Sequence, residues 1–378
     1  MASIQKRPDG RWRARYRDGA GKEHSRHFKR KVDAQRWVDE VTASIVTGQY
    51  VDPNAGRVLF RDYAELWREA QVHRPSSHDH VEGMLRRHAY PFFGDRHISS
   101  ILPSEIQAWV KRLASGDRTT KRVPLAPTTV GVVHGIVSQI FRAAVRDRKL
   151  LANPCEGTRL PRAEKRRVIP VTTTQVEKLR EGMPDELKAL VVFAAGTGLR
   201  QGEVFGMTRD RLRLLGRNPV VIVDRQLVQR RIIGPQFGPL KTKASYRTVP
   251  LPKIVVEALN NHIDAYDIAE DGLLFTMSGH PIGRSAFGHL FRPVALTAGL
   301  NAHTGTGMHA LRHYYASLLI RYGESVKTVQ ARLGHASAAE TLDTYSHMWP
   351  DAEDRTRDAI DDVLGKGERE HREDEGVG

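Results

Sequence analysis

The sequence contains one cysteine, Cys155, in 378 residues. An internal disulfide needs two thiols and a cysteine-rich zinc site needs more, so neither supports this fold. No apolar run approaches the roughly 20 residues of a membrane-spanning helix. The N-terminal stretch MASIQKRPDGRWR lacks the apolar core of a signal peptide. We therefore expect a cytoplasmic protein without membrane attachment.

Acidic residues are also scarce, but only over part of the chain. The whole sequence has 59 Lys and Arg against 44 Asp and Glu. Residues 351–378 hold 11 acidic and 5 basic side chains, so residues 1–350 carry 54 minus 33, or +21. A basic body with an acidic tail favours a polyanionic partner, most simply nucleic acid. The alternative is a charged surface that serves only solubility.

The first segment, residues 1–56, combines strand and helix patterns. RWRARYR (11–17) alternates strictly, so a strand would place Trp12, Ala14 and Tyr16 on one face. Its other face would then carry four arginines: Arg11, Arg13, Arg15 and Arg17. A second strand, EHSRHFK, and a helix beginning at KVDAQRW follow. We predict a small sheet backed by one helix, with the arginines entering a DNA groove; an exposed strand kept soluble by charge is the alternative.

The remaining segments give a multidomain fold. Residues 57–158 read as all helical, with Ser104 as an N-cap. The basic, proline-flanked stretch 159–172 reads as a linker. From residue 173 the pattern is mainly helical, and a capping box joins Thr174 to Glu177. Two strands, VVIVDRQLV and YRTVPLP, with GPLKTKAS near the bend between them, add a small antiparallel sheet.

Five short stretches of the third segment matter together. They are GTGLRQGEV (196–204), LKTKASYRTVPL (240–251), GMHALRHYYAS (307–317), LGH (333–335) and DTYSHM (343–348). Each alone has an ordinary structural explanation. In this order they resemble the tyrosine recombinase family, in its bacteriophage integrase branch. The resemblance covers most of the chain and implies an arm-type DNA-binding domain (1–56), a helical core-binding domain (57–158) and a catalytic domain with a C-terminal tail (173–378).

The resemblance also assigns the residues that handle the phosphate. Arg200 and Arg312 look like the two arginines that grip the scissile phosphate, whose oxygens gain negative charge under attack and match planar guanidinium groups. Glu203 looks like the acidic residue that orients Arg200. His309 and His335 resemble the histidines that orient the phosphate and manage the proton of the nucleophile.

The same resemblance supplies an acid and a nucleophile. Lys241 resembles the lysine that protonates the departing 5′ oxygen, carried on a hairpin bend, with Lys243 as the alternative. Tyr345 resembles the nucleophile, since a base and a positive field would activate its phenol. Three rival tyrosines sit in a helical stretch and read as core: Tyr314, Tyr315 and Tyr322.

The implied function is site-specific recombination at phage and bacterial attachment sites. It would proceed through a 3′-phosphotyrosine and a Holliday junction, without metal or ATP. The implied partners are double-stranded DNA, a homotetramer on that DNA, a DNA-bending host factor and an excisionase. A tail helix with Ile360, Val363 and Leu364 on one face would dock onto a neighbouring protomer; a frayed acidic end is the alternative.

Other functions stay open at this point. A DNA-binding regulator explains the charge but leaves the five stretches as coincidence. A metalloenzyme would use His303, His309, His313, His335 and His347, although HALRH lacks the Glu of a zinc-protease helix. Within the same chemistry, a type IB-like relaxing enzyme or a chromosome-dimer resolvase remains, and the extra N-terminal arm argues against the resolvase.

Overall fold

The computed structural model describes residues 2–18, 21–48, 50–52, 54–116, 123–163, 167–230 and 233–349. The chain divides into two compact units, Met1–Glu164 and Lys165–Gly378, and each is described by itself. The division falls inside the stretch 159–172, whose described residues form neither helix nor strand. The tail residues Ile360, Val363 and Leu364 lie outside the described ranges.

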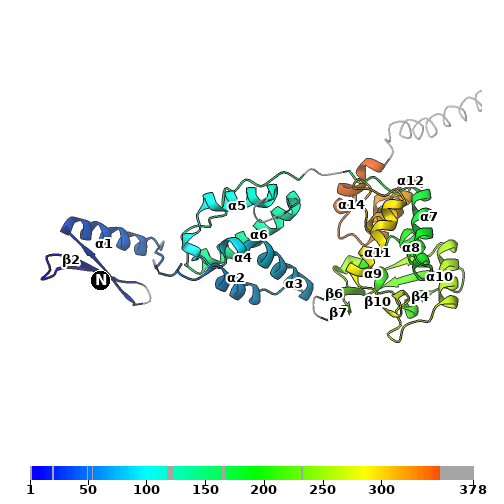
Figure 1. The fold of residues 1–378 in the computed structure, drawn as a ribbon, viewed down its shortest axis with the longest axis horizontal. Helices are drawn as coiled ribbons and strands as arrows, with labels where there is room; N and C mark the ends of the chain where they lie inside the picture. The colour runs from blue at the N-terminus through cyan, green and yellow to red at the C-terminus, as the bar shows by residue number, and fades with distance from the viewer. Residues whose placement is uncertain are drawn as a thin grey trace, which may run out of the picture. The chain divides into compact units, whose positions relative to one another are not determined.

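The first unit begins with a three-stranded antiparallel sheet in the order β1-β2-β3 (Figure 1). Its elements are β1 Ser3–Lys6, β2 Trp12–Arg17, β3 Glu23–Phe28 and the following helix α1 Lys31–Val46. Ala14 of β2 packs with Ala34 and Val38 of α1 in a small core, so the predicted alternation is confirmed. Strand β1 was not predicted, because SIQK holds one apolar side chain and shows no period.

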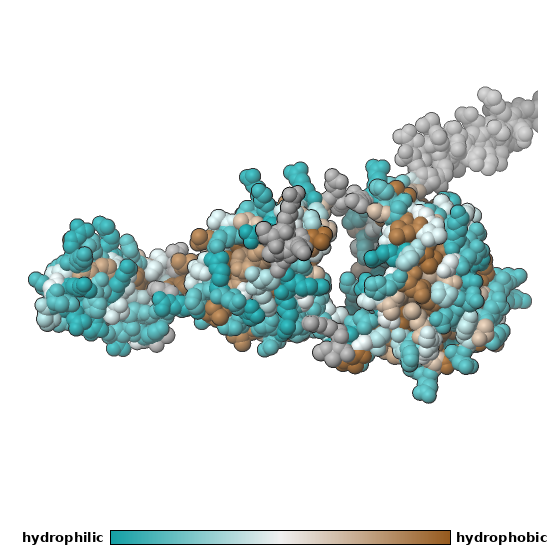
Figure 2. Space-filling view, in the orientation of Figure 1, coloured by the Kyte–Doolittle hydropathy of each residue, from teal (hydrophilic) through white to brown (hydrophobic). Residues whose placement is uncertain are grey.

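Polar contacts join the segment after α1 to this sheet. The hydroxyls of Tyr16 and Tyr50 lie 2.8 Å apart, and Lys22 Nζ donates to Asp52 Oδ2 at 2.9 Å. The Tyr16 and Tyr50 rings also meet edge to face. These contacts extend the small domain beyond its apolar core, and Figure 2 shows that its visible face is mostly hydrophilic.

A helical domain follows in the same unit. Its elements are α2 Phe60–Glu69, α3 Pro75–Met84, the π-helical turn η1 Leu85–Ala89, α4 Tyr90–Phe93, the 3₁₀ turn η2 Ile98–Ser100, α5 Pro103–Ser115 and α6 Pro127–Arg146. Phe60, Phe93, Trp109 and Phe141 form a chain of aromatic contacts through its core. Helix α5 begins at Pro103, with Leu102 rather than Ser104 as N-cap, because Pro suits the first helical turn.

Helix α6 is long and apolar enough to cross a membrane by length and composition alone. Its apolar residues are also the core of the helical domain, since Val133, Val137 and Ile140 are all buried there. A core helix of this kind passes the same test, so the finding is weak evidence for a membrane span.

The second unit is mainly helical with small antiparallel sheets. Its helices are α7 Thr173–Gly182, α8 Asp185–Thr197, α9 Gln201–Phe205, α10 Lys253–Ala265, α11 Arg284–Thr297, α12 His309–Arg321, α13 Val326–Leu333 and α14 Ala338–Tyr345. Its strands are β4 Leu212–Arg213, β5 Val220–Val223, β6 Gln226–Arg230, β7 Gly234–Gly238, β8 Arg247–Pro250, β9 Thr276–Met277 and β10 His280–Pro281. Short 3₁₀ turns are η3 Arg209–Arg211, η4 Lys243–Ser245 and η5 Ser346–Met348.

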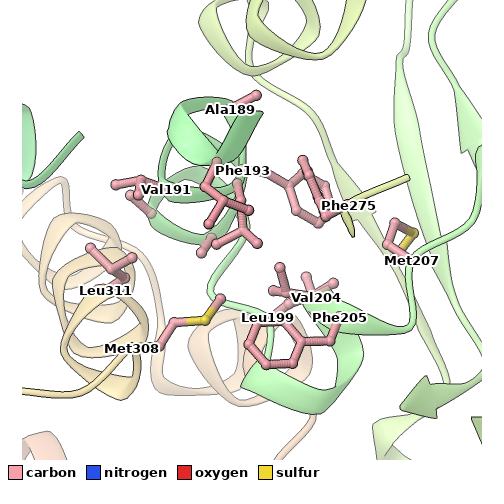
Figure 3. Close-up of a cluster of buried hydrophobic side chains, with 14 of the residues drawn as sticks. Ala189, Val191, Phe193, Leu199, Val204, Phe205, Met207, Phe275, Met308 and Leu311 are labelled. Atoms are coloured by element: carbon pink, nitrogen blue, oxygen red, sulfur yellow. The ribbon is translucent and has the colours of Figure 1, made fainter. Parts of the chain in front are cut away.

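Helix α8 lies at the centre of this unit and packs against α7, α10 and α12. Figure 3 shows Phe193 of α8 directed toward Phe275, with Val204 and Phe205 of α9 below them and Leu311 of α12 on the other side. The Phe193 side chain is fully buried, as the strongly apolar sequence ELKALVVFAAGTG predicts. The core therefore fixes α9, which follows Arg200, and α12, which carries Arg312, against one central helix.

Two details of this unit differ from the sequence prediction. VVIVDRQLV is not one strand: β5 pairs with β8, whereas β6 turns away and pairs with β7. The capping box joins Thr172 to Gln175, two residues earlier than predicted. TTTQVE offers two overlapping capping boxes, and local sequence alone does not choose between them.

Candidate active site

Arg200 occupies the corner between α8 and α9. Helix α8 ends at Thr197, and Gly198 adopts a left-handed conformation with φ of 63° that reverses the chain. Arg200 is the N-cap residue of α9. Its Nη2 donates to the carbonyl of Gly334 at 3.0 Å and its Nη1 to Ser245 Oγ at 3.2 Å. The guanidinium thus joins three segments that are distant in the sequence.

A buried carboxylate lies beneath this arginine. Glu203 is 1% exposed, and its Oε1 accepts from Arg200 Nη1 at 3.1 Å while its Oε2 accepts from Arg247 Nη2 at 2.8 Å. Burial opposes ionisation of Glu203, but the charges and hydrogen bonds of Arg247 and Arg200 outweigh it and lower its pKa. Glu203 bonds to Arg200, the residue that the resemblance pairs it with, and Arg247 is a partner that the sequence analysis missed. No spacing in YRTVPL marks it.

Arg312 is 2% exposed on the first turn of α12. Its Nη1 donates to the carbonyl of Gly198 at 2.7 Å and its Nη2 to the carbonyl of Leu333 at 2.8 Å. Burial, followed by the charge of Arg200, lowers its pKa to about 9, so it stays protonated at neutral pH. A buried guanidinium held by carbonyl oxygens and beside a second guanidinium forms a strongly positive site.

The carbonyls that hold both arginines come from two helix ends. Gly198 follows α8, and Gly334 follows α13 with φ of 65°. A Cβ on Gly198 would lie 2.4 Å from Cδ1 of Tyr315, so glycine is required there for both its backbone conformation and its size. Helix C-termini carry partial negative charge and favour cations, which stabilises the two guanidinium groups where they sit.

The two predicted histidines flank Arg312 with different surroundings. His309 is the first residue of α12 and keeps an exposed surface. Desolvation of its packed side and the charges of Arg312 and Arg200 lower its pKa to about 4. His335 is buried, and its Nδ1 bonds with Thr341 Oγ1 at 2.8 Å. Burial and the charge of Arg312 also lower the His335 pKa to about 4, so both imidazoles are neutral at pH 7.

Tyr345 ends helix α14 and is 1% exposed. Burial raises the pKa of its phenol to about 12, while the charge of Arg312 acts to lower it. Its hydroxyl lies 2.7 Å from Nδ1 of His313, a contact that the sequence analysis did not assign. The i, i+4 spacing of His309 and His313 on α12 was the available signal, since it places both rings on one face.

The rival tyrosines have other contacts. Tyr315 shares a buried cluster with Tyr345 but packs its ring against Gly198, and Tyr314 bonds to Thr173 Oγ1 at 3.0 Å. Tyr322 is exposed at the C-cap of α12, so the prediction that it is a core residue is wrong. Arg312 and Glu340 are the charged groups that act on Tyr345. Tyr345 is therefore the tyrosine that the fold places within the field of Arg312.

Lys241 and Lys243 are both exposed in the connection between β7 and β8. The sequence analysis expected Lys241 on the bend of a hairpin, and this expectation is wrong. The hairpin is formed by β6 and β7, and it ends at Gly238, before Lys241. Thr242 Oγ1 lies 2.9 Å from Ser245 Oγ, which in turn accepts from Arg200. The hydroxyls of Thr242 and Ser245 thus connect the segment that carries Lys241 and Lys243 to the guanidinium of Arg200.

Sequence comparison adds the family. The phage integrase family matches residues 170–351, the phage integrase N-terminal domain matches 2–47, and the phage integrase N-terminal SAM-like domain matches 59–114. The chain belongs to the phage integrase family of tyrosine recombinases. The family and the fold class expected from the five stretches are therefore confirmed, and so is the expectation of a DNA recombinase at the level of the family.

Relatives of this integrase-family chain cover nearly its whole length. A putative prophage integrase of Mycobacterium tuberculosis is 26% identical over 355 residues, covering 91% of this chain and 90% of the relative. A XerC-like tyrosine recombinase of Caldanaerobacter subterraneus is 27% identical over 383 residues, covering 92% and 94%.

Solved structures share the fold. The Tn1549 transposon integrase in complex with circular intermediate DNA aligns with a TM-score of 0.63 at 23% identity, covering 80% of this chain and 98% of that one. A lambda integrase tetramer bound to a Holliday junction aligns with a TM-score of 0.54 at 18% identity, covering 89% and 96%. At these identities the likeness concerns the fold.

Three of the four arginines predicted to enter a DNA groove lie close to an internal carboxylate. Side-chain nitrogens of Arg13, Arg15 and Arg17 lie 3.6, 3.8 and 3.8 Å from the carboxylate of Glu23 on the neighbouring strand. Arg11 precedes β2 and is exposed. Arg13, Arg15 and Arg17 thus share one face of β2, as predicted. Glu23 offsets part of the repulsion between these arginines, which was expected to require an external anion.

Of the five histidines of the metalloenzyme alternative, His309, His313 and His335 lie near one another, but among the described residues they do not form a group with the ligand spacing of a metal site. His335 bonds to Thr341, His347 Nε2 lies 3.0 Å from the carbonyl of Val168, and His303 is exposed. Within the described ranges, the group with the spacing of a metal site is Asp18, His24 and Asp52 in the N-terminal sheet domain. The described residues of the second unit therefore provide no support for a histidine metal centre.

Proposed function

We propose that this chain is a site-specific integrase that cuts and rejoins DNA at phage and bacterial attachment sites. The observation that carries the proposal is the burial of Tyr345 within the field of Arg312, whose guanidinium also interacts with that of Arg200. A phenol, two arginines and two neutral histidines form a site suited to nucleophilic attack on a phosphodiester.

The arginines provide the electrostatic stabilisation. A guanidinium has five N–H donors in a planar fork. Two donors of Arg312 hold it to the carbonyls of Gly198 and Leu333, which pre-orients the rest of the fork before DNA arrives. Preorganised donors stabilise the charge that develops on phosphate oxygens by roughly 3–4 kcal/mol each. Glu203 keeps Arg200 in the matching orientation.

Tyr345 acts as the nucleophile in this proposal. Its oxygen bonds to phosphorus while its proton passes to the neutral imidazole of His309 or His335, and the bond to the 5′ oxygen breaks, which leaves a 3′-phosphotyrosine and a 5′ hydroxyl. Lys241 protonates the leaving oxygen, with Lys243 as the alternative acid. His309 and His335 contact the phosphate as neutral imidazoles, consistent with their lowered pKa values of about 4. The linkage conserves the energy of the phosphodiester, so rejoining needs no ATP.

The proposal extends to assembly and targets. The three segments act as arm-binding (1–56), core-binding (57–158) and catalytic (173–378) domains, joined by the linker 159–172. A homotetramer exchanges strands through a Holliday junction and thereby integrates or excises a phage or mobile-element genome. A DNA-bending host factor and an excisionase assist in the bacterial cytoplasm. The prophage integrase relative and the lambda integrase tetramer on a Holliday junction support this extension.

Covalent trapping tests the proposal. Wild type, Tyr345→Phe and the control Tyr322→Phe are expressed in cells that carry the source attachment DNA, lysed in denaturant with EDTA, and the DNA that stays bound to protein is sequenced. Adducts at one locus in wild type and the control, but not in Tyr345→Phe, support it. Adducts in all three would mean that another residue is the nucleophile. Intact DNA binding without any adduct would favour the regulator.

A further inference from the structure

The hydroxyl of Tyr345 has a partner in the free protein that neither the motifs nor the family assignment identify. Nδ1 of His313 lies 2.7 Å from this hydroxyl, and the two rings are 5.6 Å apart at 66°. His313 sits one turn after His309 on α12, and their rings meet at 4.6 Å in a T-shaped arrangement. The helix that begins at His309 and carries Arg312 therefore also holds the phenol.

The two histidines assigned to the reaction have other contacts. His335 uses its Nδ1 for Thr341, and its Nε2 faces Glu340 at 3.9 Å. The ring of His309 packs on His313. The direction of the phenol oxygen is thus set from α12 through His313, although Tyr345 itself belongs to α14.

The protonation states decide the direction of the hydrogen bond. Burial, then the neighbouring charges of His309 and Arg312, lower the pKa of His313 to about 3, so its ring is neutral at pH 7. The phenol keeps its proton, because burial raises its pKa to about 12. A protonated phenol and a neutral imidazole pair best when the hydroxyl donates to Nδ1, with the ring proton on Nε2.

We propose that His313 is a positioning residue for the nucleophile: its Nδ1 accepts the hydrogen bond of the Tyr345 hydroxyl and fixes where the phenol oxygen points. The inference rests on the proposed function, since it needs Tyr345 to be the nucleophile. It assigns His313 no net proton, because the pKa values of about 3 and about 12 strongly oppose full transfer. Fixing the direction of the phenol oxygen lowers the entropic cost of reaching the in-line geometry for attack on a phosphate held by Arg312.

The test compares three variants of the full chain. His313→Leu removes the acceptor at similar volume. His313→Asn keeps it, because the amide Oδ1 stands two bonds from Cβ as Nδ1 does. Tyr314→Phe is the matched control, since it removes a hydroxyl contact with Thr173 from the same helix without touching Tyr345. Each is measured for duplex affinity, thermal midpoint and single-turnover rate of covalent complex formation.

A spectroscopic reading separates positioning from general damage. Tyr345 is replaced by 3-fluorotyrosine in wild type and in each variant, and the fluorine resonance is recorded without DNA. We expect His313→Leu to shift this resonance and to slow covalent complex formation about 10- to 100-fold, the effect of losing an oriented hydrogen bond. Duplex affinity should stay unchanged. His313→Asn and Tyr314→Phe should stay within about threefold of the wild-type rate.

The outcomes separate this inference from the function on which it rests. A wild-type rate in His313→Leu overturns the inference, as does a slow rate with an unmoved fluorine resonance. A slow His313→Asn variant would also overturn it, because the acceptor is still present. Adducts that persist in Tyr345→Phe would instead overturn the proposed function, whatever His313 does.

Discussion

Replacing Glu203 by Gln should lower the free energy of unfolding of the second unit, Lys165–Gly378, far more than the same change at an exposed glutamate. The carboxylate is 1% exposed and accepts from Arg200 at 3.1 Å and from Arg247 at 2.8 Å. Its backbone-facing oxygen also accepts the amide N–H of Arg200 at 2.9 Å, which caps α9. The amide of Gln keeps the shape but removes the negative charge, and its NH₂ group can only donate, so the guanidinium that it faces loses its acceptor.

The magnitude follows from the burial of this network. Removing one partner of a buried ion pair leaves an uncompensated charge and typically costs about 3–5 kcal/mol. The matched control is Glu257→Gln on α10, whose pair with Lys253 spans 3.6 Å between exposed side chains. Exposed pairs contribute about 1 kcal/mol or less. We therefore expect a difference of about 2–4 kcal/mol between the two variants.

The assay must read the second unit alone, because the chain has two units and its unfolding need not be two-state. Urea titrations with pulsed hydrogen exchange, followed on peptides from 185–205, report α8 and α9 directly. The lowered pKa of Glu203 means that its contribution is present above the ordinary Glu pKa and is lost as pH falls through the folded value. The gap between wild type and Glu203→Gln should accordingly narrow in acid. Equal losses in Glu203→Gln and Glu257→Gln at pH 7 would refute the reasoning.

Three further predictions use the same style of control. In urea titrations, Gly198→Ala should destabilise the second unit by about 2–4 kcal/mol and Gly216→Ala by about 1 kcal/mol. Both glycines have positive φ, but a Cβ would meet neighbouring atoms only at Gly198, so equal losses would contradict the steric argument. Lys241→Ala should slow DNA cleavage about 10²- to 10⁴-fold. A substrate with sulfur at the 5′-bridging position should restore the rate, because a thiolate leaves without a proton. If only Lys243→Ala behaves in this way, Lys243 is the general acid. Glu23→Gln should strengthen duplex binding at low salt about two- to fivefold in fluorescence anisotropy, because the arm arginines lose their internal counter-ion; weaker binding would show that Glu23 orients them.

Local patterns in the sequence were sufficient for most elements. The alternation of RWRARYR predicts β2 with Ala14 inward, and the apolar run before Gly198 predicts the buried helix α8. These periods depend only on backbone geometry, so they can be read without knowing the fold. Short elements without a period, such as β1 and the β6–β7 hairpin, were missed or merged with neighbours.

The sequence by itself determined the family, because the five stretches carry side chains that phosphoryl chemistry needs, in a fixed order. Only the tertiary structure decided how those side chains are held. Arg247 reaches Glu203 across 44 residues, His313 reaches Tyr345 across 32, and Arg200 reaches the carbonyl of Gly334 across 134. Such contacts arise from the packing of whole helices, which brings together backbone carbonyls and side chains that no local spacing relates. The partners of the proposed catalytic residues therefore depend on the placement of α12, which packs with α8 in one buried cluster and with Tyr345 of α14 in another.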